Sequence, residues 1–504
     1  MGKSHHTAGR IPSWERLWRG LEGRSGYLLA VMLILFFALF SLAAVRKYEL
    51  FRMGFDVALI HQAVWNTIQG RFLETHAYDF TNSLLGVDSL LMAAWLSPLY
   101  ALFPSVYTLL IAQIAIVTLG ALPLYWLTRE RLGGAAGLLV AAAYLLYPPV
   151  EYGSLYEIRL RIMAMAWLGF LFLFVERRTY WAMWPFLFLA LSCRLDATIA
   201  VAMVGLYAFL RRRPWYYGTT LLLAGLGWYL AMTQAIIPSL STRSGYMFLE
   251  HYRPLGSTLG EILRTAVTQP GLVLQIIFQP AKVWYLFQMG LPLLFTPLLA
   301  PQTMVPVLPL FLLNLLSSRS IQFDIYHHYQ GPITVFLMVG TILAWETAAR
   351  AGDRSRAHLR IPLLGWWSRL GRENRIRLFG LALLAASLAC NLAFRNPLPS
   401  IFFGRAPERT ATARSLIARI PPDVPVAASN LLSPFIPMRR DIFLVPGGAF
   451  HYAEHPEERA DYILLDLQSE FGEEERALLE RLRAQPAWEV LAEQDGYVLL
   501  MRRP

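Results

Sequence analysis

The chain has 504 residues, of which 56% are hydrophobic and only 16% are charged. A soluble globular protein carries about 25% charged residues, so this composition excludes the ordinary soluble class and indicates a membrane protein. The net charge of +11 falls in short segments between apolar blocks and does not indicate nucleic-acid binding. The two cysteines, Cys193 and Cys390, form no disulfide framework and no metal motif.

Residues 1–26 are polar and basic, and we expect them to be a cytoplasmic segment. The first apolar block, Tyr27 to Val45, has no cleavage site of small residues after it and is expected to be a retained anchor. Recurring apolar blocks predict a mainly α-helical, polytopic membrane domain over residues 27–395 with about eleven transmembrane helices. The predicted spans are residues 27–45, 107–127, 133–149, 162–176, 180–193, 196–211, 216–237, 284–300, 302–317, 331–349 and 377–395.

The placement of the arginines predicts how these spans are oriented. The loops that alternate with the basic loops carry mainly acidic, His and Tyr residues. By the positive-inside rule, the N-terminus lies in the cytoplasm, and an odd number of spans puts the C-terminal part outside the cell membrane. The basic loops contain Arg129 and Arg131, Arg177 and Arg178, Arg211 to Arg213, and a series of arginines from Arg350 to Arg375.

One apolar stretch, Asp88 to Phe103, is not counted as a span. It is short, begins with Asp88 and contains Pro98. Counting it would also invert every later loop and place the arginines outside. We therefore interpret it as a re-entrant or interfacial element of the first external loop, residues 46–106.

From residue 396 to residue 504 the composition changes to short apolar strands that alternate with charged, helically spaced segments. This alternation predicts a small extracytoplasmic α/β domain. Two helices are expected, at Pro407 to Arg419 and Glu473 to Arg483, and no phosphate-binding glycine loop is present. The expected strands are Val424 to Ala428, Ile442 to Val445, Tyr462 to Leu467 and Tyr497 to Met501.

Asp56 is the first candidate for chemistry. It lies in the first external loop, ahead of the amphipathic run Ala58 to Ile68. A carboxylate there could act as a general base or a metal ligand, or it could cap a helix that starts at Val57. The chain contains no catalytic triad, HExxH motif or Cys/His metal spacing, so the sequence assigns no metal site and leaves a divalent metal open.

The second external loop, residues 150–161, and the next polar boundary carry further candidates. Glu157, Arg159 and Arg161 suit a phosphate clamp, or they are interfacial charges that reach water. Arg194 and Asp196 hold an anionic group or a metal, or they form an ion pair with each other.

The segment before the tenth predicted span carries His328 and Tyr329. One histidine there, with Asp324, could carry a proton or bind phosphate, although aromatic anchoring at the interface explains the tyrosines equally well. His251 and Arg253 are similar candidates, in the external segment before Pro254. All of these groups are predicted to lie on the same side of the membrane.

From about Tyr48 to the C-terminus, the chain resembles the prokaryotic membrane-protein family called domain of unknown function 2079. The order of several short motifs carries the resemblance. These are Gly54-Phe55-Asp56, His61-Gln62-Ala63-Val64-Trp65-Asn66, Gly70-Arg71-Phe72, Ser97-Pro98-Leu99-Tyr100, Ala121-Leu122-Pro123-Leu124-Tyr125, the segment Glu250 to Gly256, the segment Pro309 to Ser317, His328-Tyr329 and Val426-Ala427-Ala428-Ser429-Asn430.

The family resembles the GT-C membrane glycosyltransferases, which take a sugar from a polyprenyl-phosphate carrier. The resemblance implies that Asp56 is the acidic residue of the first external loop that serves as base or metal ligand. The chain departs from the family pattern at three places. Asp88 stands where the family has His, residues 158–161 read Ile-Arg-Leu-Arg in place of Phe-His-Pro-Glu, and Arg194-Leu195-Asp196 replaces Lys-Glu-Asp.

Together these observations predict a GT-C-like glycosyltransferase of the cell membrane, with Asp56 as base and with Arg159, Arg161 and Arg194 on the leaving phosphate. Direct displacement predicts inversion at the anomeric carbon. The alternative is a catalytically inactive protein of the same fold, which would bind a partner protein through its outer domain. The lost His and Glu positions favour that alternative.

Overall fold

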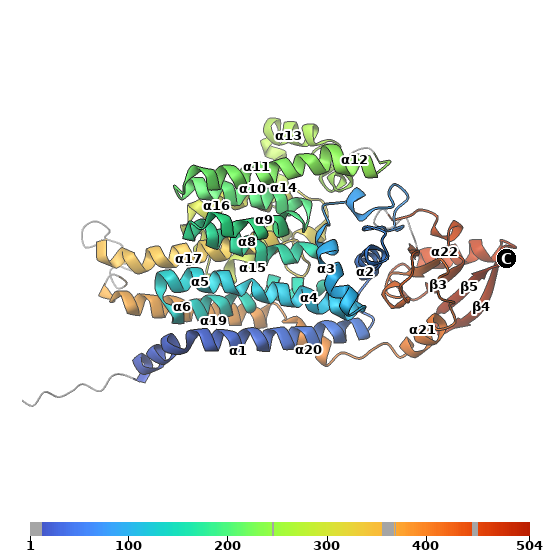
Figure 1. Ribbon diagram of the computed structural model, residues 1–504, viewed down its shortest axis with the longest axis horizontal. Helices are drawn as coiled ribbons and strands as arrows, with labels where there is room; N and C mark the ends of the chain where they lie inside the picture. Colours follow the sequence, from blue (N-terminus) through green and yellow to red (C-terminus); the bar gives the residue numbers. More distant parts are fainter. Residues whose placement is uncertain (1–12, 244–245, 355–366, 368, 446–451, 504) are drawn as a thin grey trace, which may run out of the picture.

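The computed structural model describes residues 13–243, 246–354, 367, 369–445 and 452–503. It shows a long helical bundle with a small α/β domain at one end (Figure 1). We call the end of the bundle that meets this domain the domain end, and the opposite end, where α1 begins, the distal end. The predicted fold class, a mainly helical membrane protein with a small C-terminal sheet, is confirmed.

The bundle is built mostly from helices that run between these two ends. Near its centre lies α8, in which almost every side chain is buried. The helices are α1 (Ser13–Glu49), α4 (Val106–Leu119), α5 (Ala121–Leu132), α6 (Gly134–Leu145), α7 (Pro148–Tyr156), α8 (Leu160–Arg177), α9 (Trp184–Leu191), α10 (Leu195–Leu210), α11 (Trp215–Ala231), α12 (Ile237–Leu240), α13 (Leu259–Thr268), α14 (Pro270–Ile277), α15 (Pro280–Gly290), α16 (Pro301–Leu315), α17 (Gly331–Arg354), α19 (Arg372–Ala393) and α20 (Pro397–Phe402).

Five stretches of the described residues are long and apolar enough to cross a membrane as single helices, or six if the bent pair α6 and α7 is one span. Shorter apolar helices, α9, α10 and α16 among them, complete the bundle. Glycines allow some of these to pack closely, because a Cβ atom on Gly205 of α10 would lie 2.7 Å from the carbonyl oxygen of Gly218 in α11. Integral membrane character is therefore clear, whereas the number of eleven spans stays a prediction.

The predicted span 284–300 is wrong as a continuous helix. Helix α15 ends at Gly290 and is followed by two short 3₁₀ turns. Pro292 and Pro297 have no backbone N–H to donate, and Leu294 and Phe295 adopt left-handed φ values of 54° and 53°. Proline therefore breaks an apolar segment that hydropathy alone cannot distinguish from a span.

The first loop of the domain end contains two helices, α2 (Phe55–Ile68) and α3 (Met92–Leu102), which pack against each other. Helix α3 falls within the stretch 88–103 that the sequence analysis left out of the spans. Helix α2 is buried along most of its length because it also contacts strand β2 (Ile442–Val445) of the C-terminal domain. This loop therefore lies between the bundle and the C-terminal domain.

The C-terminal domain is a five-stranded sheet in the order β2-β1-β3-β5-β4, with β1 parallel to β2 and β3 and with β5 antiparallel to β3 and β4. The four predicted strands and both predicted helices are present, with slightly different ends. The unpredicted strand is β4, whose side chains are mostly exposed. The elements are β1 (Val426–Ser429), β2, β3 (Tyr462–Asp466), β4 (Trp488–Gln494), β5 (Tyr497–Arg502), α21 (Thr410–Ile417) and α22 (Gly472–Arg483).

A buried carboxyl group lies where β1 and β3 end. Glu475 of α22 is inaccessible to solvent and accepts hydrogen bonds from Ser429 Oγ (2.6 Å), Ser469 Oγ (2.7 Å) and the backbone N–H of Asp466 (2.6 Å). Burial raises the pKa of Glu475 from 4.5 to about 7, although these hydrogen bonds oppose the shift. Between about pH 4.5 and 7 the native state therefore keeps a proton that the unfolded chain has lost. The stabilisation that comes from the uncharged carboxyl group is present at low pH and is lost as the pH rises through about 7.

We expect Glu475→Gln to stabilise the protein at pH 8, by up to about 3 kcal/mol, and to change its stability little at pH 5. An amide at this position cannot ionise. The substitution therefore removes the free-energy cost of a buried carboxylate only at pH values at which the carboxyl group is ionised. The thermal unfolding midpoint of the full chain in detergent, measured at both pH values, checks this. The exposed Glu473 of the same helix provides the control, Glu473→Gln. A stabilisation of equal size at pH 5 and pH 8 would contradict the expectation.

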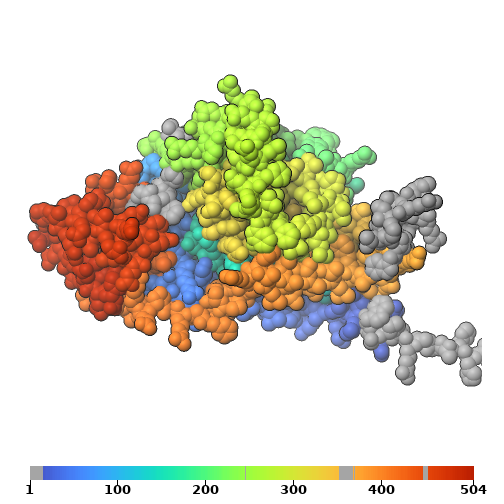
Figure 2. Space-filling model, turned by 180° about the vertical axis from the view of Figure 1, so that it is seen from behind, coloured from blue at the N-terminus to red at the C-terminus, as the bar shows by residue number. Residues whose placement is uncertain are grey.

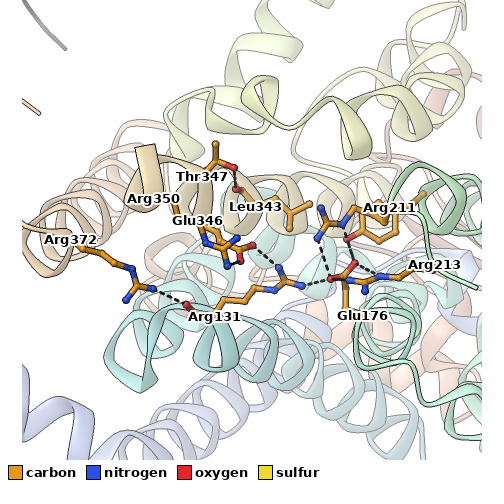
Figure 3. Close-up of polar contacts among 10 residues, drawn as sticks. Arg131, Glu176, Arg211, Arg213, Leu343, Glu346, Thr347, Arg350 and Arg372 are labelled. Atoms are coloured by element: carbon orange, nitrogen blue, oxygen red, sulfur yellow. Dashed lines mark hydrogen bonds and ion pairs between the residues drawn. The ribbon is translucent and has the colours of Figure 1, made fainter. Parts of the chain in front are cut away.

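A network of buried charges joins the helices at the distal end (Figure 3). Glu176 at the end of α8 forms ion pairs with Arg131, Arg211 and Arg213 and accepts a hydrogen bond from Tyr207 Oη at 2.8 Å. Arg131 also lies 2.6 Å from Glu346 of α17, which pairs in turn with Arg350. The network therefore ties α5, α8, α10 and α17 together, and it gathers arginines from three of the predicted cytoplasmic loops at one end of the bundle.

Candidate active site

The Gly54-Phe55-Asp56 turn at the domain end places Asp56 in the first turn of α2. The backbone N–H of Gly54 donates to Glu157 Oε1 at 2.9 Å, and the N–H of Phe55 donates to Asn430 Oδ1 at 2.8 Å. The alternative that Asp56 caps a helix starting at Val57 is wrong. The helix begins at Phe55, and partners from distant loops satisfy its first N–H groups, which leaves the Asp56 carboxylate available to other groups.

Arg159 bridges the two nearest carboxylates. Its guanidinium pairs with Asp56 and lies 3.0 Å from Glu157 Oε2. Burial raises the pKa of Glu157, while Arg159 opposes the shift. Tyr452, from the C-terminal domain, donates a hydrogen bond to Asp56 Oδ1 at 2.9 Å. The Asp56 side chain nevertheless stays 26% exposed, so its oxygens remain accessible from the cavity described below.

Gln113 of α4, which the sequence analysis did not single out, fixes the loop that carries Arg159. Its Nε2 donates to the carbonyl oxygens of Ser154 (2.9 Å) and Glu157 (2.7 Å), and its Oε1 accepts from the N–H of Arg159 at 2.6 Å. A buried amide that satisfies three backbone groups holds the loop in one conformation. A lone polar residue in a predicted span was the only signal of this role.

The other two candidate arginines also form ion pairs across loops. Arg161 Nε lies 2.5 Å from Asp196 Oδ2, and Arg194 Nε lies 3.0 Å from Asp88 Oδ2. The predicted alternative of an ion pair between Arg194 and Asp196 is therefore wrong. Residue 194 has extended backbone and residue 196 lies in the first turn of α10, so the two side chains leave the chain in different directions and find partners elsewhere.

Asp88 is the most buried of these acids, with a side chain only 1% exposed. Besides Arg194, it accepts hydrogen bonds from the backbone N–H groups of Ser89 (2.7 Å) and Leu195 (2.9 Å) and from Tyr246 Oη (2.9 Å). A carboxylate held by this many donors has a fixed orientation and holds its arginine in place. Asp88 therefore positions the start of α10 and the Arg194 side chain.

His328 is buried beside the three arginines. Neither ring nitrogen has a hydrogen-bond partner within the described part of the chain. Burial lowers the pKa of His328 well below its usual value, and the charges of Arg159, Arg161 and Arg194 lower it further. The imidazole is therefore neutral near pH 7, with one donor and one acceptor to offer a ligand. The neighbouring Tyr329 ring stacks under the Arg161 guanidinium, 4.3 Å from its centroid.

These residues surround one cavity of about 440 Å³ at the domain end, which we call the polar cavity. Both polar and apolar atoms line it, and it receives side chains from the bundle and from the C-terminal domain. The candidates that line it are Asp56, Asp88, Glu157, Arg159, Arg161, Arg194, His328 and Tyr329. The structure thus brings together eight residues that the sequence analysis proposed from four separate segments.

A second cavity, of about 350 Å³, adjoins the first and is mainly apolar. Side chains of α13, which lies with α14 on the surface of the bundle (Figure 2), cover it together with α16. Asp196 and His251 line this second cavity, whereas Arg253 is exposed and lines neither. The residues shared by the two cavities are Arg161, Arg194, Phe248 and Tyr329.

Four residues of the C-terminal domain line the polar cavity and were not predicted as site residues, and two of them, Asn430 and Tyr452, contact the start of α2. The strand that ends in Asn430 was noted only as part of the family resemblance. Nothing in the sequence distinguished Tyr452, because tyrosines are common both on the surface and in the core of soluble domains. Only the docking of the domain onto α2 brings either side chain to Asp56.

Comparisons with known proteins bear on the fold. The fold is similar to that of ArnT from Cupriavidus metallidurans, in a crystal structure bound to undecaprenyl phosphate, with a TM-score of 0.51, 13% identity, and coverage of 93% of this chain and 97% of that one. The apo structure of ArnT gives the same TM-score and identity over 94% and 98% of the two chains. The predicted GT-C-like fold is thereby confirmed. No curated protein matches the chain.

The family model described as "Predicted membrane protein (DUF2079)" matches residues 46–499, which covers the first external loop, the helical bundle and nearly all of the C-terminal domain. The resemblance stated from the short motifs is thereby confirmed, and the chain belongs to the DUF2079 family of predicted membrane proteins.

Proposed function

We propose that the protein is a membrane glycosyltransferase that moves a sugar from a polyprenyl-phosphate carrier to an acceptor hydroxyl. The observation that carries the proposal is the pair of adjoining cavities. A polar cavity lined by Asp56 and four arginines meets an apolar cavity at Arg161 and Arg194. A polyprenyl-phosphate sugar has the same division, with an apolar chain, a phosphate at the junction and a polar sugar. The likeness of the fold to ArnT, which was crystallised with undecaprenyl phosphate, supports the proposal.

In this mechanism the acceptor hydroxyl attacks the anomeric carbon of the donor sugar. Asp56 takes the hydroxyl proton as the new carbon–oxygen bond forms. The bond between the anomeric carbon and the phosphate oxygen breaks, and the phosphate leaves with the electron pair. Arg161 and Arg194 stabilise its charge by charge-assisted hydrogen bonds. Displacement in one step inverts the anomeric configuration.

The residues present do not suit a divalent metal in this arrangement. No group of three or more His, Cys, Asp or Glu is placed to hold a metal ion within the described residues. Asp56 and Glu157 are close together, but they share Arg159, whose guanidinium lies between them. The mechanism therefore assigns to arginines the charge stabilisation that a cation would otherwise supply.

The distribution of charge also supports a proposed orientation, with the distal end in the cytoplasm and the domain end outside. Arg131, Arg211 and Arg213 gather at the distal end (Figure 3), whereas eight of the candidate site residues line the cavity at the domain end. By the positive-inside rule this distribution supports an outer location for the C-terminal domain and the cavity.

Binding of undecaprenyl phosphate to the purified full chain, followed by native mass spectrometry, tests the donor site. We expect the double variant Arg161→Gln with Asp196→Asn to weaken binding by about 10- to 100-fold, because one charge-assisted contact to phosphate is lost. Replacing both partners leaves no unpaired buried charge, so folding is preserved. Arg253→Gln, at an exposed arginine that lines neither cavity, is the matched control. Equal binding by the two variants would contradict the proposed donor site.

A second candidate function is a catalytically inactive binding protein. The observation that favours it is that Arg159 and Tyr452 both engage Asp56. On this view the carboxylate is a structural partner that fixes the domain on the bundle. A chain that binds no undecaprenyl phosphate but purifies with a protein partner in fixed proportion would support this function against the first.

A further inference from the structure

The polar cavity has two chemically different ends. One end, which we call the arginine end, adjoins the apolar cavity and is marked by the two shared arginines, Arg161 and Arg194. The other end, which we call the domain-lined end, is lined by Asp56, Glu157 and Arg159 together with residues of the C-terminal domain. The C-terminal domain supplies four of these residues, Asn430, Leu444, Tyr452 and Glu470.

The domain-lined end is a built surface, because specific contacts hold it against α2. Asn430 lies so close to the α2 turn that a Cβ atom on Gly54 would meet its Oδ1 at 2.5 Å. The Tyr452 ring packs edge-on against Phe55, with the centroids 4.8 Å apart, and lies 5.1 Å from the ring of Tyr78. The hydrogen bond from Tyr452 to Asp56 then joins the domain to the proposed base itself.

The charge at the domain-lined end is negative. Asp56, Glu157 and Glu470 contribute three carboxyl groups, and Arg159 is the only cation among the described residues at this end. Glu470 accepts a hydrogen bond from Asn430 Nδ2 at 3.2 Å and forms no ion pair with a described residue. Three carboxyl groups against one guanidinium give this end an excess of acidic side chains.

The arginine end lacks this excess of carboxylates. Arg161 and Arg194 are each paired with one carboxylate, Asp196 and Asp88 respectively. The phosphate of the proposed donor therefore fits the arginine end, and Asp56 lies between this end and the C-terminal domain. An acceptor that delivers a hydroxyl to Asp56 from the other side must occupy the domain-lined end.

We propose that the domain-lined end receives the acceptor, and that it selects a neutral or positively charged hydroxyl compound, such as a glycoside or an amino glycoside, over an anionic one. The inference rests on the proposed function. Asn430 and Tyr452 provide uncharged hydrogen-bonding groups that suit sugar hydroxyls, while the excess of carboxylates repels phosphate or carboxylate substituents. The C-terminal domain is thus the part of the chain that sets acceptor specificity.

Three probes with one ring, methyl glucoside, the methyl glycoside of glucosamine and methyl glucuronide, test the inference. Their affinities for the full chain in lipid nanodiscs are measured by saturation-transfer NMR, with undecaprenyl phosphate added to occupy the arginine end. We expect the glucuronide to bind about tenfold more weakly than the other two, because like charges a few ångströms apart repel through partly screened surroundings.

Reversing one charge should change this preference. Glu470→Lys is expected to reduce the discrimination against the glucuronide by about fivefold, since it replaces repulsion by attraction at the edge of the cavity. Glu473→Lys makes the same charge change on an exposed residue of the same domain that does not line the cavity, and it should leave the preference unaltered.

The outcomes separate this proposal from the donor assignment. Equal binding of the three probes, absence of binding by all of them, or equal effects of the two Lys variants would overturn the acceptor assignment. Failure of undecaprenyl phosphate to bind in the same samples, with the probe preference intact, would overturn the donor assignment alone.

Discussion

Replacing Asp56 with Asn is expected to lower the rate of sugar transfer by about 10²- to 10⁴-fold, the usual effect of removing a general base. The amide cannot accept the acceptor proton, yet it has nearly the same shape as the carboxylate. Transfer is measured with radiolabelled polyprenyl-phosphate sugars and the purified full chain, by counting label in the product that no longer partitions with the lipid.

The fold should survive this change. Arg159 keeps Glu157 as a partner at 3.0 Å, and the amide oxygen can still accept the hydrogen bond from Tyr452. Undecaprenyl phosphate binding should therefore stay within about twofold of the parent chain, because no contact of the arginine end is lost. Asp79→Asn serves as the control, since Asp79 is an exposed partner of Arg459 at the same end of the molecule. Transfer at the parent rate by Asp56→Asn would remove Asp56 from the mechanism and favour the binding-protein function.

The sequence predicts the membrane domain and the C-terminal sheet well because both depend on local patterns. Hydropathy identifies apolar helices, and alternating short strands identify the sheet. Prediction from the sequence fails where contacts between distant residues or backbone stereochemistry determine the local structure. The segment 284–300 is apolar throughout, but Pro292 and Pro297 break it. Strand β4 is an exposed edge strand with charged residues. The only sequence signal of its hairpin with β5 is the Asp495-Gly496 turn, in which both residues have positive φ.

The candidate site shows a different limit of sequence reasoning. The residue types are predictable, because charged groups at a membrane boundary are costly and usually functional. Their partners are not, because each ion pair joins two loops that are brought together only by the bundle. Arg194 lies two positions from Asp196 in sequence but pairs with Asp88, while Asp196 pairs with Arg161.

The ion pairs explain how the charged residues at the three departures from the family pattern are accommodated. Asp88, which stands where the resemblance implies a histidine, pairs with Arg194. Arg159 and Arg161, which stand where it implies a histidine and a glutamate, pair with Asp56 and Asp196. Each of these charges therefore has an opposite charge beside it.

The largest effect on stability is expected at the distal end, from Glu176→Gln. Glu176 has a side chain only 1% exposed, and three arginines depend on its charge. Removing one member of a buried ionic network leaves the others uncompensated, which costs about 3–5 kcal/mol. Glu130→Gln is the matched control, because Glu130 is 45% exposed and, among the described residues, pairs only with the partly exposed Arg177. That change should cost at most about 1 kcal/mol.

Thermal unfolding midpoints of the two variants in the same detergent, read from tryptophan fluorescence, measure the difference. We expect a clear drop for Glu176→Gln, no measurable change for Glu130→Gln, and partial recovery when Arg131→Met accompanies Glu176→Gln, since that pair removes a buried cation along with its partner. Equal midpoints for the two Gln variants would mean that the distal arginines are solvated independently of Glu176. In that case the network would mark only the cytoplasmic boundary and would not hold α5, α8 and α17 together.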